Sequence, residues 1–141
     1  LGWDDWQFYG NFSYVDGRID QINNAGTEIH DRPKGMPPPM GMVGLRWEDP
    51  VEELGVEVFT QMAYHVSDSR YTDPDRNNIQ RIPPGGVPGW ATVNLRGWYQ
   101  INENLTASVA LENLNDQDYR IMDSGLQAPG RNLIVTFQVD F

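Results

Sequence analysis

The last ten residues of the chain, Asn132 to Phe141, constrain its fold more than any other stretch. Every second side chain there is apolar, and these are Leu133, Val135, Phe137, Val139 and Phe141. The positions between them are polar, with Ile134 as the exception. Because a strand sends successive side chains to opposite faces, the pattern predicts a strand with one apolar and one mostly polar face. Its length matches the ~9–11 residues that a tilted strand needs to cross a bilayer.

Five other stretches repeat this alternation. Together with the terminal stretch, the expected strands are residues 6–15, 40–48, 55–67, 90–101, 105–113 and 132–141. Long polar connections follow the first, third and fifth of these strands, and short turns follow the second and fourth. Bacterial outer-membrane barrels have this asymmetry, with short periplasmic turns and longer extracellular loops. The pattern therefore predicts an all-β protein, an antiparallel up-and-down transmembrane β-barrel.

Six strands are too few to close such a barrel, because membrane barrels begin at about eight strands. An open sheet edge is not viable in hydrocarbon, where unpaired backbone groups find no water. We therefore expect the chain to be a fragment of a larger barrel, in preference to a chain that associates with further strands.

Composition excludes several other classes of protein. The net charge of -10 and a pI near 4.4 argue against a nucleic-acid partner, which would require a basic patch. The absence of cysteine excludes a disulfide scaffold and a cysteine-ligated zinc site. The mean hydropathy of -0.56 is compatible with a membrane barrel, which needs only every second strand residue to be apolar.

No pattern for catalysis or cofactor binding stands out. The two histidines, His30 and His65, are far apart in the sequence, and no nucleophile elbow, HExxH helix or phosphate loop occurs. The acidic loop with Asp68, Asp73 and Asp75 lacks the spacing of an EF-hand, so a solvated face is favoured over a calcium site. We expect a protein that is not an enzyme and carries no cofactor or metal.

Aromatic side chains gather near the ends of the expected strands, as interfacial girdles require. Trp90 is expected to belong to the girdle on the outer side. Tyr9, Phe59 and Trp98 break the scheme, because they share the polar face of their strands.

Several segments in combination resemble the C-terminal end of TonB-dependent outer-membrane receptors. They are Pro88-Gly89-Trp90, the run from Leu111 to Arg120, Pro129-Gly130-Arg131-Asn132 and the terminal Phe141. The family-motif residues are Glu112, Asn113, Asp116, Tyr119, Gly130, Arg131 and Asn132, and we expect them to be structural. Gly44-Leu45-Arg46-Trp47 is similar to an earlier strand of the same family. The likeness extends over about 38–141.

This resemblance implies a barrel of about 22 strands around an N-terminal plug, of which the chain holds about the last six strands and no plug. It implies ligand-gated uptake of a siderophore-like or other bulky nutrient across the outer membrane of a Gram-negative type cell. The implied partners are the remaining barrel strands and plug of the same receptor, TonB through a segment outside this chain, and the lipid bilayer. A further implied partner is the outer-membrane assembly machinery, which would recognise the closing strand through Phe137, Val139 and Phe141.

Charged side chains on the polar face are the candidates for a lumen-facing site. The charged residues and histidine whose positions in the strand alternation place them on this face are Arg46, Glu57, His65 and Arg96. At the lipid midplane an arginine costs ~2–4 kcal/mol, so these charges are expected to face the lumen. There they could contact the plug or a passing ligand, or pair with one another across neighbouring strands.

Two alternatives remain open on the sequence. One is a soluble all-β binding module, such as a carbohydrate-binding sandwich, in which the apolar faces form a core between two sheets. The other is an outer-membrane barrel that does not transport. The strict alternation of loop lengths favours a membrane barrel over a sandwich.

Overall fold

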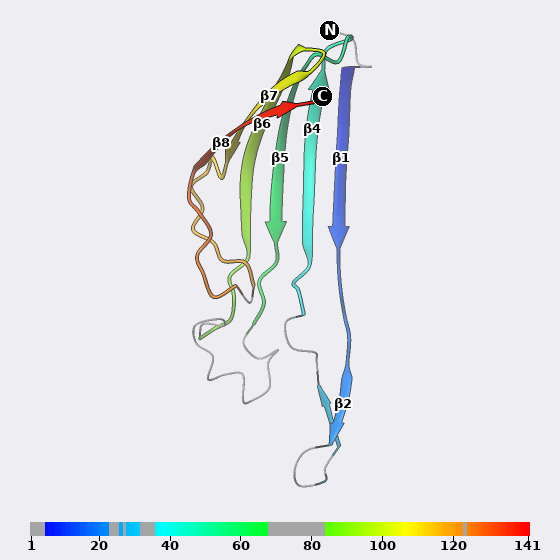
Figure 1. Cartoon of the computed structure of the whole chain (residues 1–141). Helices are drawn as coiled ribbons and strands as arrows, with labels where there is room; N and C mark the ends of the chain where they lie inside the picture. The colour runs from blue at the N-terminus through cyan, green and yellow to red at the C-terminus, as the bar shows by residue number, and fades with distance from the viewer. Residues whose placement is uncertain (1–4, 23–25, 27, 32–35, 68–83, 123) are drawn as a thin grey trace.

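The computed structural model describes residues 5–22, 26, 28–31, 36–67, 84–122 and 124–141. These residues form a six-stranded antiparallel sheet and a separate two-stranded hairpin, and no helix occurs among them (Figure 1). The strands of the sheet, in spatial order, are β1 (Trp6–Ser13), β4 (Met40–Glu48), β5 (Leu54–Ala63), β6 (Trp90–Asn102), β7 (Leu105–Glu112) and β8 (Asn132–Val139). The hairpin consists of β2 (Ile19–Ile22) and β3 (Glu28–Asp31).

Each strand of the sheet overlaps one of the six segments that the sequence predicts. The largest difference is at β5, which ends at Ala63 and not at Ser67. Beyond Ala63 the chain leaves the ladder, and Val66 instead forms two backbone hydrogen bonds with Val87, of 2.9 and 2.8 Å. The expectation of one long loop after the first strand was wrong, because the β2–β3 hairpin forms within it and extends beyond the end of the sheet (Figure 1).

The two short turns lie at one end of the sheet, and the strand ends that lead into the long connections lie at the other (Figure 1). In the first turn, the Leu54 amide donates to Asp49 Oδ1 at 2.8 Å, and Glu52 adopts a left-handed backbone with φ 60°. In the second turn, the Asn104 amide donates to Asn102 Oδ1 at 2.9 Å. Short polar side chains that accept from nearby amides are typical of tight turns.

The strand register aligns the apolar side chains of all six strands on one face. One row crosses the whole sheet and consists of Phe8, Leu45, Val58, Leu95, Leu111 and Leu133. Phe8 is 77% exposed and Leu133 is 60% exposed, so this apolar face has no protein layer over it. A sandwich would cover the face with a second sheet, and none packs there among the described residues.

Within the strands of the sheet, the buried side chains lie on the opposite, polar face. Four of them are at most 7% exposed, namely Glu57, Phe59, Thr92 and Asn94. They occupy the alternate strand positions, which face away from the apolar row. Soluble proteins bury apolar side chains and expose charged ones, so this sheet has the inverse arrangement.

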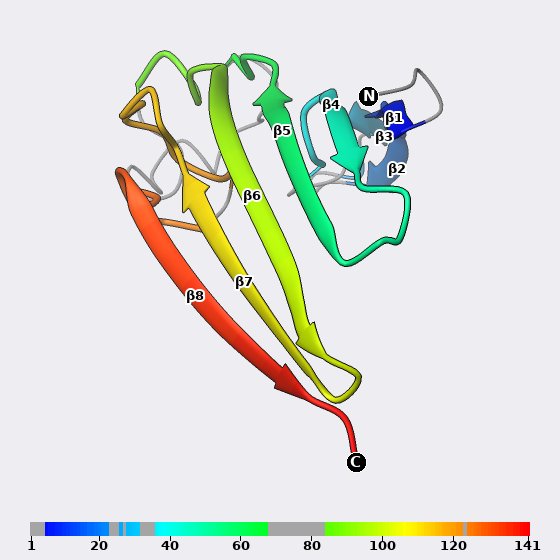
Figure 2. The same cartoon turned by 90° about the horizontal axis from the view of Figure 1, so that it is seen from above.

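The sheet is twisted and curved but not closed, with β1 and β8 at its two edges (Figure 2). Within the described part of the chain, β1 pairs only with β4 and β8 pairs only with β7. Among the same residues, no helix has the length and apolar character to span a membrane.

Candidate functional site

The polar face carries a row of charged side chains on three neighbouring strands. Arg46 on β4 lies opposite Glu57 on β5, and Glu57 lies opposite Arg96 on β6. Nε and Nη2 of Arg46 donate to Oε2 of Glu57 at 2.8 and 2.5 Å. Nη1 of Arg96 lies 3.5 Å from Oε1 of Glu57. Of the two roles that the sequence left open, pairing across neighbouring strands is therefore present in the structure.

Burial differs sharply among these three charges. The Glu57 side chain is 3% exposed, whereas those of Arg46 and Arg96 are 35% and 45% exposed. A buried carboxylate needs partners, because an unpaired buried charge is strongly unfavourable. The guanidinium groups of Arg46 and Arg96 supply those partners.

The aromatic residues on the polar face pack against these arginines. The guanidinium carbon of Arg46 lies 5.7 Å from the ring centre of Tyr9 and 5.4 Å from that of Trp98. That of Arg96 lies 5.3 Å from the ring centre of Phe59. Contacts of this kind between a cation and a ring are stabilising, by about 0.5–1 kcal/mol at exposed sites.

Two glycines make room for these rings. Gly44 pairs with Tyr9 and Gly55 pairs with Trp98 in the strand register. A Cβ at Gly44 would lie 2.3 Å from Cζ of Tyr9, and a Cβ at Gly55 would lie 2.0 Å from Cζ2 of Trp98. The rings therefore lie over the bare glycine backbone, and the prediction that Tyr9, Phe59 and Trp98 share the polar face is confirmed. Their packing role was missed, because only the register reveals which residue faces each ring.

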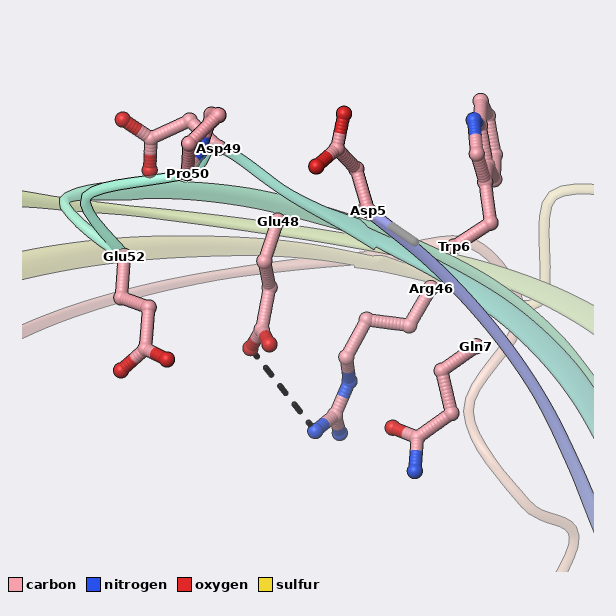
Figure 3. A pocket seen from close by; sticks show the side chains of 8 residues that line it. All are labelled: Asp5, Trp6, Gln7, Arg46, Glu48, Asp49, Pro50 and Glu52. Atoms are coloured by element: carbon pink, nitrogen blue, oxygen red, sulfur yellow. Dashed lines mark ion pairs between the residues drawn. The ribbon is translucent and has the colours of Figure 1, made fainter. Parts of the chain in front are cut away.

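An open hollow adjoins the cluster at the short-turn end of the sheet (Figure 3). Its volume is about 570 Å³, and it is lined by Asp5, Trp6, Gln7, Arg46, Glu48, Asp49, Pro50 and Glu52. In Figure 3, Gln7, Arg46 and Glu48 project to the same side of the ribbon, and Oε1 of Glu48 lies 4.0 Å from Nη1 of Arg46. Among the described residues, no group of three or more His, Cys, Asp or Glu side chains could hold a metal ion.

A second polar cluster lies at the long-loop end and contains the family-motif residues. Asn113 is 2% exposed and has a left-handed backbone with φ 53°. Its side-chain amide donates to the carbonyls of Gln117 at 3.0 Å and Pro129 at 3.1 Å, and its Oδ1 accepts from the Gln117 amide at 2.9 Å. Its own backbone amide donates to Oδ1 of Asn94 at 2.9 Å. Asn113 therefore links the end of β7 to β6 and to the loop that precedes β8.

Two further side chains hold this loop, residues 114–131, against the sheet. Asn115 extends the β6 ladder past the end of β7, since its Oδ1 accepts from the Val93 amide at 3.0 Å and its Nδ2 donates to the Ala91 carbonyl at 2.9 Å. Asp116, with φ 52°, accepts from the backbone amide and from Nη2 of Arg131, both at 3.3 Å. Asn94 and Asn115 were missed by sequence reasoning, although asparagine at a strand end is a recognisable signal for such side-chain to backbone bonds.

The remaining motif residues make further contacts in the same region. Nδ2 of Asn132 donates to Oε2 of Glu112 at 3.4 Å, which joins β8 to β7. A Cβ at Gly130 would lie 3.1 Å from Oδ1 of Asp116. Tyr119 packs on Trp90 with ring centres 4.3 Å apart. The motif residues thus make their contacts within the chain, at the end of β7, at the start of β8 and in the loop between them.

The expectation that Trp90 belongs to an outer girdle was wrong. Trp90 pairs with Ala63, so it lies on the polar face with Phe59 and not on the apolar one. On that face its ring packs against the ring of Tyr119, with the two centres 4.3 Å apart.

Other residues singled out by the sequence lie apart from both clusters. His65 is exposed beyond the end of β5, and the structure does not bring it to Arg46, Glu57 or Arg96. Phe137 and Val139 are 66% and 50% exposed on the apolar face of β8, and Phe141 follows the strand and is fully exposed. The acidic residues Asp68, Asp73 and Asp75 fall outside the described residues.

A known protein family and several solved structures are similar to this chain. The barrel family described as TonB dependent receptor-like matches residues 1–114. Among curated protein sequences, none matches. Of 23 solved chains that match, one is the copper transporter OprC, with a TM-score of 0.74 and 18% identity over 100% of this chain. Another is the ferric-catecholate import receptor Fiu from E. coli, with a TM-score of 0.63 and 17% identity over 97% of this chain.

The chain spans 21% of the length of the first of these structures and 19% of the second. At these identities the structural likeness establishes the fold, an antiparallel part of a barrel wall. The family match covers most of the chain and includes β1 to β7 with both short turns. The chain therefore belongs to the TonB-dependent receptor β-barrel family.

Proposed function

We propose that this chain forms the last six strands of the barrel of a TonB-dependent outer-membrane receptor, which takes up a siderophore-like or other bulky nutrient. The observation that carries the proposal is the uncovered apolar row across all six strands, opposite a polar face that holds the buried charges. Lipid on one side and a polar interior on the other account for both faces at once.

Strand length supports this assignment. At about 3.3 Å per residue, the ten residues of β5 extend about 33 Å, which is enough to cross a hydrocarbon core of about 30 Å with some tilt. The free edges of β1 and β8 would pair with the remaining strands of the same barrel, since an open edge is not tolerated in hydrocarbon.

The proposed interior contains the Arg46–Glu57–Arg96 cluster and the plug of the receptor. Barrels of about 22 strands are wide enough to require a plugged lumen. The two structural neighbours are a copper transporter and a ferric-catecholate import receptor by name, which supports a metal-containing cargo. Binding and gated passage, driven through TonB, would be the activity, without catalysis.

The terminal strand is proposed to interact with the outer-membrane assembly machinery. Phe137, Val139 and Phe141 are exposed on one face, and the backbone of β8 has a free edge to which another strand could add. The exposed apolar side chains would contact lipid after assembly, so the two roles are compatible.

Uptake by the full-length receptor tests the proposal. The gene that contains this chain would be expressed in a Gram-negative strain that lacks its own siderophore receptors, with and without TonB. We expect outer-membrane localisation and TonB-dependent accumulation of at least one labelled ferric siderophore or metal chelate. A barrel that reaches the outer membrane but admits small solutes without TonB would instead support a passive pore.

A further inference from the structure

The apolar face of the sheet is not evenly filled. Its central row carries an apolar side chain on every strand, whereas the row next to the long connections contains a glycine. In that row Gly41 on β4 lies between Phe12 on β1 and Met62 on β5. A Cβ at Gly41 would lie 3.7 Å from Cδ2 of Phe12 and 3.8 Å from Cγ of Met62. The missing side chain therefore leaves a gap with a large apolar side chain on either side.

This gap is part of an open apolar groove, which we call the Gly41 groove. Its volume is about 380 Å³, and it is lined by Phe12, Pro39, Met40, Gly41, Met62, Ala63 and Tyr64. β4 runs along its middle, with β1 and β5 on its two sides (Figure 1). No lining residue is charged, and the Tyr64 amide is already paired with the Pro39 carbonyl at 2.9 Å. The groove thus offers an occupant apolar contacts and few hydrogen bonds.

The completed barrel would leave the Gly41 groove open. A further strand beside β1 would adjoin Phe12 on its outer side, whereas Gly41 lies one strand further in. Phe12 and Met62 are both exposed, so no described residue covers them. An empty groove is unfavourable because its lining loses dispersion contacts, and water would find few polar partners there. An apolar occupant resolves both costs.

The position of the groove indicates which apolar molecule occupies it. The groove is continuous with the face that the proposed function places against lipid, at the end of the sheet that leads to the long, extracellular connections. Gly41 is three residues, or about 10 Å, from Gly44 at the middle of β4. Half of the hydrocarbon core is about 15 Å thick. Gly41 therefore lies at the depth of the acyl chains of the outer leaflet.

The size of the groove also favours a lipid chain over a protein partner. Seven residues line the groove. A specific protein interface uses about 20–30 residues on each side. A single linear hydrocarbon chain needs only the narrow strip between two neighbouring strands.

We propose that the Gly41 groove binds one acyl chain of an outer-leaflet lipid, which lies along β4 between Phe12 and Met62. This inference rests on the proposed function. It goes beyond general contact of the apolar face with the bilayer, because it assigns one chain to a defined site. Chains elsewhere on the face are expected to exchange freely.

A lipid with brominated acyl chains locates the bound chain directly. The full-length receptor would be crystallised from bilayers of phosphatidylcholine whose acyl chains carry bromine, and the bromine would be located by anomalous scattering. We expect a peak between Phe12 and Met62 that is stronger than any other on the apolar face. Peaks of equal strength along the whole face would overturn the inference. Protein density in the groove, from a second copy or from the same chain, would overturn it as well.

A matched pair of variants on β1 tests the site in solution. Phe12→Ala removes one side of the groove, whereas Phe8→Ala removes a ring of similar exposure, 77% against 74%, from the same face. Native mass spectrometry would count the lipid retained after mild extraction from outer membranes. The affinity for lipid should fall about tenfold in Phe12→Ala, because the chain loses its contact with the ring, and stay unchanged in Phe8→Ala. Equal retention in the two variants would contradict a defined site.

A second pair blocks the groove instead of widening it. Gly41→Leu fills the groove from within and should abolish lipid retention, whereas Gly97→Leu on the same face of β6 should not. Retention by Gly41→Leu at the wild-type level would overturn the inference. Phe12→Ala adds no atoms, so the test does not depend on whether the sheet tolerates leucine at position 41.

The identity of the retained lipid and the activity of the receptor complete the test. The retained lipid should be lipopolysaccharide, the lipid of the outer leaflet, and a phospholipid in its place would overturn the assignment to that leaflet. Outer-membrane localisation and TonB-dependent uptake are measured on the same preparations. A wild-type receptor that transports normally but retains no lipid refutes this inference alone, whereas a receptor that is absent from the outer membrane refutes the proposed function.

Discussion

Replacement of Gly55 by alanine should destabilise the sheet, although alanine is the better strand residue. The added Cβ would lie 2.0 Å from Cζ2 and 2.2 Å from Cε2 of Trp98. The indole would therefore have to leave its place over the glycine. It would then lose its contact with Arg46, whose guanidinium carbon lies 5.4 Å from the ring centre.

The size of the effect follows from three contributions. Forcing an extra carbon into an occupied site costs about 1–3 kcal/mol, and the lost contact between ring and cation is worth about 0.5–2 kcal/mol. Replacing a strand glycine returns about 0.5–1 kcal/mol, because the unfolded chain has less freedom to lose. We expect Gly55→Ala to lower the free energy of unfolding by about 2 kcal/mol.

The matched control is Gly97→Ala on the neighbouring strand. A Cβ there would meet only the Gly55 carbonyl oxygen, at 3.6 Å, which is an ordinary contact. This variant should be as stable as the wild type or up to about 1 kcal/mol more stable. Urea unfolding of the full-length receptor in detergent, followed by tryptophan fluorescence, measures both. Equal stability of the two alanine variants would refute the idea that Gly55 is required by the Trp98 ring.

Three further predictions concern the two clusters and the two faces. Glu57→Gln should lower the free energy of unfolding by about 2 kcal/mol, because two arginines lose their shared carboxylate, while Glu53→Gln in the exposed turn should have little effect in the same urea titration. Asn113→Ala should be more destabilising than Asn113→Gly, since both lose the side-chain hydrogen bonds but only alanine is strained at φ 53°. The measurement is the rate of proteolysis within residues 114–131, which should be faster in the alanine variant. Val135→Arg should lower the free energy of unfolding of lipid-reconstituted receptor by about 2–4 kcal/mol, because its face contacts the bilayer core, and Thr136→Arg on the opposite face should lower it much less. Similar losses for the two variants would argue against a lipid-facing side.

Much of the strand pattern was accessible from the sequence because side-chain alternation is a local property. The β4 segment agrees with the structure at both ends, and β8 ends two residues before the predicted strand does. The exceptions arise where distant residues compete with the ladder. Val66 pairs with Val87 and ends β5 early. The β2–β3 hairpin has no comparable run of alternating residues that would have marked it in advance.

The candidate sites were accessible only in part. The alternation of side chains along the strands identified the three central charges as facing the same side, but it does not say which of them pair. It also grouped His65 with them, although His65 lies beyond the end of β5. Trp90 illustrates the opposite error, because its position near a strand end indicated a girdle, whereas the partner that covers it, Tyr119, is far away in the sequence.

The alternation of apolar and polar residues, the order of short and long connections and the motif near the C-terminus were sufficient to determine an antiparallel barrel wall and its family. Only the tertiary structure decided which residues meet. Register is set by pairing between strands, and a shift of one residue would exchange the two faces of a strand. The arrangement of Arg46, Glu57 and Arg96 in one row, and of Tyr9 and Trp98 over Gly44 and Gly55, follows from that register. These contacts join residues on different strands, so no local pattern in the sequence could specify them.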